Sequence, residues 1–168
     1  MTPLAIFLWN KHHCLNKVFR SLELNKEFKK TKIYIFIDYA DPLSEEYAAN
    51  YILKNKLNKY SQYKNIKLIF RTKKFGLRKN IIDGITYLFK FYRQVIILED
   101  DLIVSKDFLN YMNQSLNFYR NNKSIFSISA FNHKDYESFI SKNYKYDKWN
   151  WNRARTWGWG TWRNRWEM

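Results

Sequence analysis

Three consecutive carboxylates, Glu99, Asp100 and Asp101, are the residues with the clearest capacity for chemistry. They directly follow the apolar run at residues 95–98, so they stand where a buried strand emerges. Adjacent negative charges repel one another, and a cation would offset that repulsion. Carboxylate oxygens suit Mg²⁺ or Mn²⁺, ions that often bind through one or two carboxylates together with substrate phosphates. A divalent-cation site is one interpretation of this acidic triplet; an acidic helix cap or a solvated turn is the other.

Short apolar runs alternate along the chain with segments whose apolar residues recur at helical spacing. The runs at residues 4–9, 33–37, 66–70, 95–98 and 125–131 predict five strands. The alternation predicts an α/β fold over residues 1–168, with a mostly parallel central sheet flanked by helices. Ligands of such sheets bind beyond the carboxyl ends of the strands. Because Asp38 follows the second run and the acidic triplet follows the fourth, we expect both at one site.

Two helix starts are predicted in detail. Asp41 followed by Pro42 has the pattern of an N-cap and a first helical residue, and this helix would bury Tyr47 and Tyr51. Ser105 is expected to cap a later helix that begins after the acidic triplet.

The composition is that of a globular protein with a strong positive charge. Hydrophobic residues make up 46% and charged residues 27%, and the formal net charge is +15. That charge fits an anionic partner, but it also fits a bias that enriches lysine, asparagine, isoleucine and tyrosine together. The single cysteine excludes an internal disulfide framework. No apolar stretch approaches the ~20 residues of a membrane span, so we expect a cytoplasmic protein whose membrane contact is peripheral, on an anionic surface.

Residues 96–111 resemble the acidic motif of GT-A glycosyltransferases. The variant Glu-Asp-Asp, then hydrophobic residues and Asp107-Phe108, is similar to that of the N-acetylglucosaminyltransferases that begin complex N-glycan branches and of bacterial sugar transferases. The flanking segments agree, because Gly84 has the family's spacing before the motif. Residues 156–162, Thr-Trp-Gly-Trp-Gly-Thr-Trp, resemble the Trp-Gly-Trp-Ala-Thr-Trp block of the bacterial enzymes.

This resemblance implies a GT-A-type nucleotide-sugar-binding fold and a metal-dependent glycosyltransferase. The donor would be a nucleotide-sugar, with UDP favoured, and the acceptor a glycan or lipid-linked molecule in cell-surface polysaccharide biosynthesis. Transfer would invert the anomeric carbon. Asp101 would be the direct ligand of Mn²⁺ or Mg²⁺, and Asp100 would bind the ribose or assist the metal shell. Glu99 would touch the donor sugar, and Asp38 would bind the base or ribose.

Further donor contacts are implied by the resemblance at two places. Arg78 stands where the family often has histidine and could pair with diphosphate oxygens, while Arg71 could do the same or remain a surface residue. Trp157, Gly158 and Trp159 would contact the donor sugar or the acceptor, because indole rings can stack on sugar faces. Tryptophan at this density also fits a core.

The general base of the reaction is not identified by the sequence. In the family it lies downstream of the tryptophan–glycine block, so we expect it beyond Met168 and expect the domain to be incomplete on its acceptor side. Asp135, Glu137 and Asp147 precede that block, and no spacing singles one out. Two other functions stay open: an inactive nucleotide-sugar-binding or interaction module, and a basic nucleic-acid-binding protein. A nucleic-acid-binding function would give the acidic triplet no role, so we expect no nucleic-acid partner.

Overall fold

The computed structural model describes residues 1–133, 140–141, 143–146 and 148–168. Within them, six strands form one sheet in the order β3-β2-β1-β4-β6-β5. The strands are β1 (Leu4–Leu8), β2 (Ile33–Ile37), β3 (Ile66–Phe70), β4 (Gln94–Glu99), β5 (Ser127–Ser129) and β6 (Trp159–Trp162). β1 is parallel to β2 and β4, and β2 to β3, whereas β6 is antiparallel to both of its neighbours. The predicted α/β fold with a mostly parallel sheet is confirmed.

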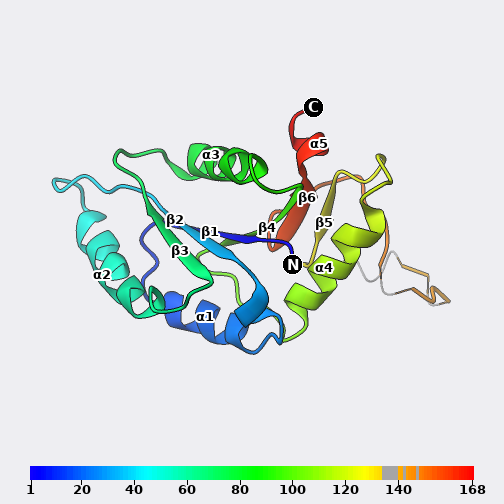
Figure 1. The fold of residues 1–168 in the computed structure, drawn as a ribbon, viewed down its shortest axis with the longest axis horizontal. Coiled ribbons are helices and arrows are strands. Elements are labelled where there is room, and N and C mark those ends of the chain that lie inside the picture. The colour runs from blue at the N-terminus through cyan, green and yellow to red at the C-terminus, as the bar shows by residue number, and fades with distance from the viewer. Residues whose placement is uncertain (134–139, 142, 147) are drawn as a thin grey trace.

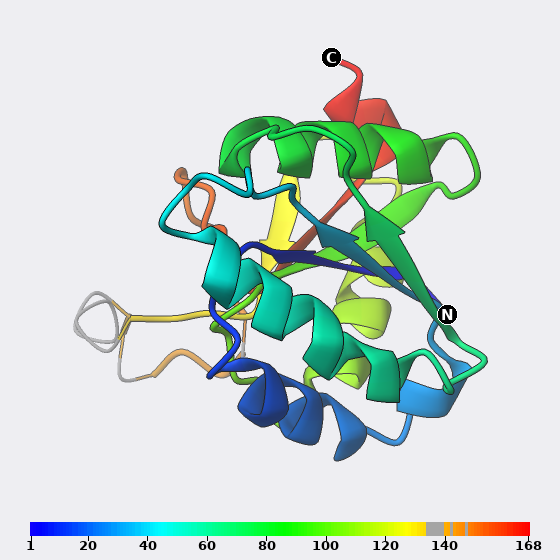
Figure 2. The same ribbon diagram turned by 90° about the vertical axis from the view of Figure 1, so that its left-hand side faces the viewer.

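Helices cover both faces of this sheet (Figures 1 and 2). α1 (Leu15–Glu23), α2 (Tyr47–Leu57) and α4 (Phe108–Tyr119) lie on one face, and α3 (Leu77–Phe89) and the short α5 (Arg163–Trp166) lie on the other. Ile6 and Leu8 of β1 belong to the apolar cluster under α1, while Ala5 and Phe7 belong to the cluster under α3. A strand buried on both faces has no polar side, which explains the uninterrupted apolar runs in the sequence. Among the described helices, none has the length and apolar character needed to cross a membrane.

Close packing of α3 on the sheet depends on Gly84. A Cβ at this position would lie 2.6 Å from Cε1 of Phe7 and 3.3 Å from Cδ1 of Phe36. The rings of Phe7 and Phe36 stack on each other, with their centroids 5.0 Å apart. The absence of a side chain at Gly84 therefore lets the helix approach this aromatic pair.

The predicted start of the second helix is wrong. Helix α2 begins at Tyr47 and not at Pro42, because Asp41 caps a turn instead: its Oδ1 accepts a hydrogen bond from the amide of Leu43 at 2.9 Å. Tyr47 and Tyr51, which were expected to be buried, are 38% and 55% exposed. The residues that α2 buries are Asn50, Leu53 and Leu57.

Two other boundaries also differ from the sequence prediction. Helix α4 begins at Phe108, whose amide bonds to the carbonyl of Ser105 at 3.2 Å, so Ser105 contributes its backbone and not its side chain. Strand β5 spans Ser127–Ser129, shorter than the run at residues 125–131. Strand β6 was not predicted as a strand, because a Trp-Gly-Thr-Trp segment carries no apolar alternation.

Candidate functional site

The carboxyl ends of β1, β2, β3 and β4 lie along one edge of the sheet, because these four strands are parallel. Asp38 directly follows β2, and the acidic triplet begins at the last residue of β4. The antiparallel strand β6 starts from the same edge. Its register pairs its first residue, Trp159, with Ile97 of β4, so Gly158 and Trp157 precede the strand on this side of the sheet. We call this side of the sheet the carboxyl edge.

A series of hydrogen bonds joins the ends of β2, β1 and β4. The side-chain amide of Asn50, on α2, donates to the carbonyl of Trp9 at 2.7 Å and to the carbonyl of Asp38 at 3.2 Å. The backbone amide of Trp9 donates in turn to Oδ2 of Asp100 at 3.2 Å. The predicted proximity of Asp38 and the acidic triplet is therefore built through two residues that the sequence did not single out.

The three carboxylates of the acidic triplet have different surroundings. Glu99 is partly buried, Asp100 is only 7% exposed, and the side chain of Asp101 is 44% exposed. The ammonium of Lys11 lies 2.7 Å from Oδ2 of Asp101 and 3.5 Å from Oδ1 of Asp100. Asp101 is thus the member most open to a ligand, while Asp100 is held in place by the amide of Trp9 and by Lys11.

Burial and the neighbouring negative charges together raise the proton affinity of Glu99. Burial raises the pKa of Glu99, the negative charges of Asp101 and Asp100 raise it further, and Lys11 opposes them. The hydrogen bond to Asp101 raises the pKa of Lys11. A positive charge is therefore favoured at this point of the carboxyl edge, and Lys11 supplies one.

The donor atoms at this point fit a hard divalent cation. They are carboxylate oxygens, the ligands that Mg²⁺ and Mn²⁺ prefer, and a cationic side chain already lies against them. Across the residues that the structure describes, no set of three or more His, Cys, Asp or Glu side chains surrounds a common point. A divalent ion would accordingly be held by one or two carboxylates, with water or phosphate oxygens completing its shell.

Asp38 anchors the loop that leads from β3 to α3. Its carboxylate is buried, and it accepts three backbone hydrogen bonds, from Tyr39 and Phe75 at 2.9 Å and from Gly76 at 2.7 Å. Gly76 has a φ of +75°, a conformation that glycine adopts at little cost, and it stands directly before α3. Asp38, the carboxylate predicted to bind the base or ribose, therefore also fixes the backbone directly before α3.

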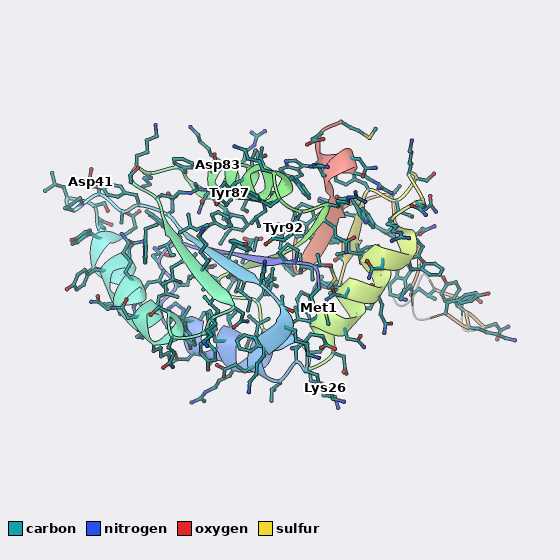
Figure 3. The ribbon with its side chains drawn as sticks, viewed as in Figure 1. Met1, Lys26, Asp41, Asp83, Tyr87 and Tyr92 are labelled. Atoms are coloured by element: carbon teal, nitrogen blue, oxygen red, sulfur yellow. The ribbon has the colours of Figure 1, made fainter. Side chains whose placement is uncertain are left out.

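The two arginines near this loop have different environments. Arg71 is occupied: it forms an ion pair with Asp83 of α3 at 2.7 Å, and its Nε donates to Asn80 at 2.9 Å (Figure 3 labels Asp83). Its guanidinium also lies 4.6 Å from the centroid of the Phe75 ring. Arg78 is exposed in the first turn of α3 and forms no hydrogen bond or ion pair within the described part of the chain. Arg78 lines a groove together with Phe75, Gly76, Leu77, Lys79 and Ile82.

The tryptophan–glycine block divides into an exposed part and a buried part. Trp157 is 53% exposed and forms a T-shaped contact with the Phe131 ring at a centroid distance of 4.6 Å. Trp159 is only 8% exposed and packs in the core under α3. Gly158 has a φ of +69°, and a Cβ there would lie 3.3 Å from the ring of Phe108. Trp157 is therefore better placed than Trp159 for the ligand contact that the sequence predicted for both.

Lys11, like Trp9 and Asn50, is a residue of this edge that the sequence did not single out. The signal was present, since Lys11 lies three residues beyond β1 and so falls at the same strand end as the residues already chosen. The carboxylates Asp135, Glu137 and Asp147 lie outside the described residues.

Comparisons with known proteins identify the family and the fold of this chain. The model of the GNT-I family matches residues 25–168. The crystal structure of S. aureus TarS is similar to this chain with a TM-score of 0.54 and 14% identity, over 71% of this chain and 20% of TarS. S. aureus TarS 1–349 in complex with UDP-GlcNAc gives a TM-score of 0.52 and 12% identity, over 71% and 32%. The chain thus spans a third or less of these proteins' length. No curated protein matches it in sequence. The expected GT-A-type fold is confirmed.

Proposed function

The chain belongs to the GNT-I family of glycosyltransferases, and on that premise we propose that it binds a nucleotide-sugar at the carboxyl edge and serves its transfer to an acceptor. The observation that carries this proposal is the pairing of an exposed carboxylate, Asp101, with a buried and fixed one, Asp100. A fixed carboxylate beside an accessible one can orient a cation that also binds phosphate oxygens.

The donor that we propose is a UDP-sugar. TarS 1–349 is known in complexes with UDP and with UDP-GlcNAc, and it has the same fold as this chain. Asp38 would meet the base or ribose through Oδ2, which accepts one hydrogen bond, whereas its Oδ1 accepts two. The exposed guanidinium of Arg78 would pair with the diphosphate, since arginine matches phosphate oxygens in two-point geometry. Trp157 would offer an apolar ring face to a sugar.

The acidic triplet would hold the metal of this reaction. Asp101 would be the direct ligand of Mn²⁺ or Mg²⁺, with Asp100 supporting the shell and Glu99 directed to the donor sugar. Such an ion, when bound, neutralises charge that develops on the departing nucleoside diphosphate. The amide of Trp9 contributes by holding Asp100 still, so that little reorganisation is needed at the site.

The acceptor side of the reaction follows from the family and from charge. We propose a glycan or lipid-linked acceptor, with inversion at the anomeric carbon and a carboxylate as general base, which we assign to none of the described residues. The formal charge of +15 favours peripheral contact with an anionic membrane, and so a place at the inner face of the cell membrane in cell-surface polysaccharide biosynthesis.

Calorimetric titration with UDP, with and without Mn²⁺, tests the donor site. The parent chain should bind UDP more tightly when Mn²⁺ is present, and Asp101→Asn should lose that dependence, because the amide cannot supply a charged ligand. Asp101 is exposed, so the variant should unfold at the same temperature as the parent. The matched control is Glu23→Gln, which removes one negative charge at the last residue of α1, the end of that helix farther along the chain from Lys11. This variant should bind UDP as the parent does.

Two results would contradict the proposal. Equal Mn²⁺-dependent affinity of the parent and Asp101→Asn would remove the metal role of the triplet. No UDP binding by the parent in either condition would remove the nucleotide site itself.

A further inference from the structure

Lys11 reaches the acidic triplet because of the order of the strands. β1 and β4 are parallel neighbours, with Phe7 level with Glu99. The segment that leaves β1 therefore passes directly beside the segment that leaves β4. Its Trp9 amide fixes Asp100, and Lys11 then extends to Asp101, a residue 90 positions later in the chain.

The ammonium of Lys11 lies on an oxygen that a metal would need. It is 2.7 Å from Oδ2 of Asp101, and both side chains are close to half exposed, at 45% and 44%. A divalent ion binds carboxylate oxygen at about 2.0–2.2 Å, with water or phosphate around it. The ammonium and the ion cannot share that side of the oxygen, so Lys11 must move away when the ion binds. The backbone keeps Lys11 near the site, so its displaced ammonium and the divalent ion repel each other.

We propose that Lys11 acts as the counter-ion of the acidic triplet when no metal is bound. In this role Lys11 lowers the affinity of the triplet for a free divalent cation and makes metal binding depend on the nucleotide. This inference rests on the proposed function. The diphosphate of a nucleotide carries negative charge to the same place, so it offsets the repulsion between the displaced ammonium and the ion. Because coupling between two ligands is reciprocal, the metal must raise nucleotide affinity by the same factor.

The experiment compares Mn²⁺ affinity in the parent chain, Lys11→Gln and Lys11→Arg, measured by the electron paramagnetic resonance signal of free Mn²⁺. Without nucleotide, Lys11→Gln should bind Mn²⁺ about tenfold more tightly, since one positive charge beside a divalent ion has been removed at a solvated site. Lys11→Arg keeps the charge and should stay within about twofold of the parent. Lys29→Gln makes the same change of net charge far from this edge, just before β2, and should also match the parent.

The titrations are then repeated with saturating UDP. The gain in Mn²⁺ affinity that UDP produces should be several-fold smaller in Lys11→Gln than in the parent, because the variant no longer needs the diphosphate to offset the lysine. Equal Mn²⁺ affinity of Lys11→Gln and the parent, with Mn²⁺-dependent UDP binding intact in both, overturns the role of Lys11 and leaves the proposed function standing. Failure of both chains to bind Mn²⁺, even with UDP, overturns the inference and the metal site together.

Discussion

The carboxylate of Asp38 offers a sharp test of how the carboxyl edge is held together. Its two oxygens accept three backbone hydrogen bonds, two of them from Phe75 and Gly76 of the loop between β3 and α3. In Asp38→Asn the size of the side chain is kept, but one oxygen becomes an NH₂ group. If the remaining oxygen keeps the two bonds at Oδ1, the NH₂ faces the amide of Gly76 at a position where the oxygen lay 2.7 Å away. Two donors then oppose each other in a buried place.

The size of the effect follows from those bonds. A hydrogen bond to a charged group contributes about 1.5–3 kcal/mol, and an unsatisfied buried donor costs about 1–3 kcal/mol. Because one bond is lost and two become neutral, the free energy of unfolding should fall by about 2–4 kcal/mol. In a chain of this size that corresponds to a decrease in Tm of roughly 5–10 °C. The damage should be local first, since this carboxylate accepts the bonds from the Phe75 and Gly76 amides, while the start of the same loop keeps the bond from the Arg71 amide to the carbonyl of Ile37.

Two measurements check the Asp38 prediction. Urea unfolding followed by circular dichroism gives the loss in stability, and hydrogen exchange gives the protection of the Gly76 amide, which should fall more than that of the β1 amides. The matched control is Asp41→Asn, since Asp41 is exposed and its one side-chain bond, to the amide of Leu43, can be kept by asparagine. That control should stay within about 0.5 kcal/mol of the parent. Unchanged stability of Asp38→Asn, with Gly76 still protected, would refute the anchoring role.

Two further predictions concern β6 and Glu99. A Cβ on Gly160 would lie 2.9 Å from the carbonyl oxygen of Val95, so Gly160→Ala should push β6 away from β4. The free energy of unfolding should fall by about 1–3 kcal/mol. A Tm within about 1 °C of the parent in calorimetry would contradict this prediction. The pKa of Glu99 is raised, so the folded chain holds this proton more tightly than the unfolded chain. The stability linked to it is complete at low pH and is lost as pH rises through the raised pKa. Glu99→Gln should therefore flatten the fall in stability above about pH 4 and be more stable than the parent at pH 7; an unchanged pH profile of urea unfolding would speak against the burial argument.

The position of the acidic triplet and of Asp38 at one edge of the sheet could be predicted, because each needs only a local pattern of residues. The acidic triplet, the apolar strand before it and Asp38 after β2 required only a local pattern and the rule that ligands bind at carboxyl ends of parallel strands. Gly84 belonged to a recognisable spacing, and the structure adds its physical reason, the approach of α3 to Phe7. The start of α2 was mistaken locally, because Asp41 can cap a turn as readily as a helix.

The amino-acid sequence by itself determined the cores of β1 to β5, the α/β class and the place of the acidic triplet, since burial on both faces of a strand leaves a continuous apolar run. Only the tertiary structure decided what those residues contact. Apolar periodicity carries no information on strand order, and it is the parallel pairing of β1 with β4 that brings Lys11 to Asp101. In the same way, the pairing of β6 with β4 buries Trp159, whereas Trp157 lies outside the strand, before Gly158 with its φ of +69°, and is exposed; the sequence alone could not tell these two tryptophans apart.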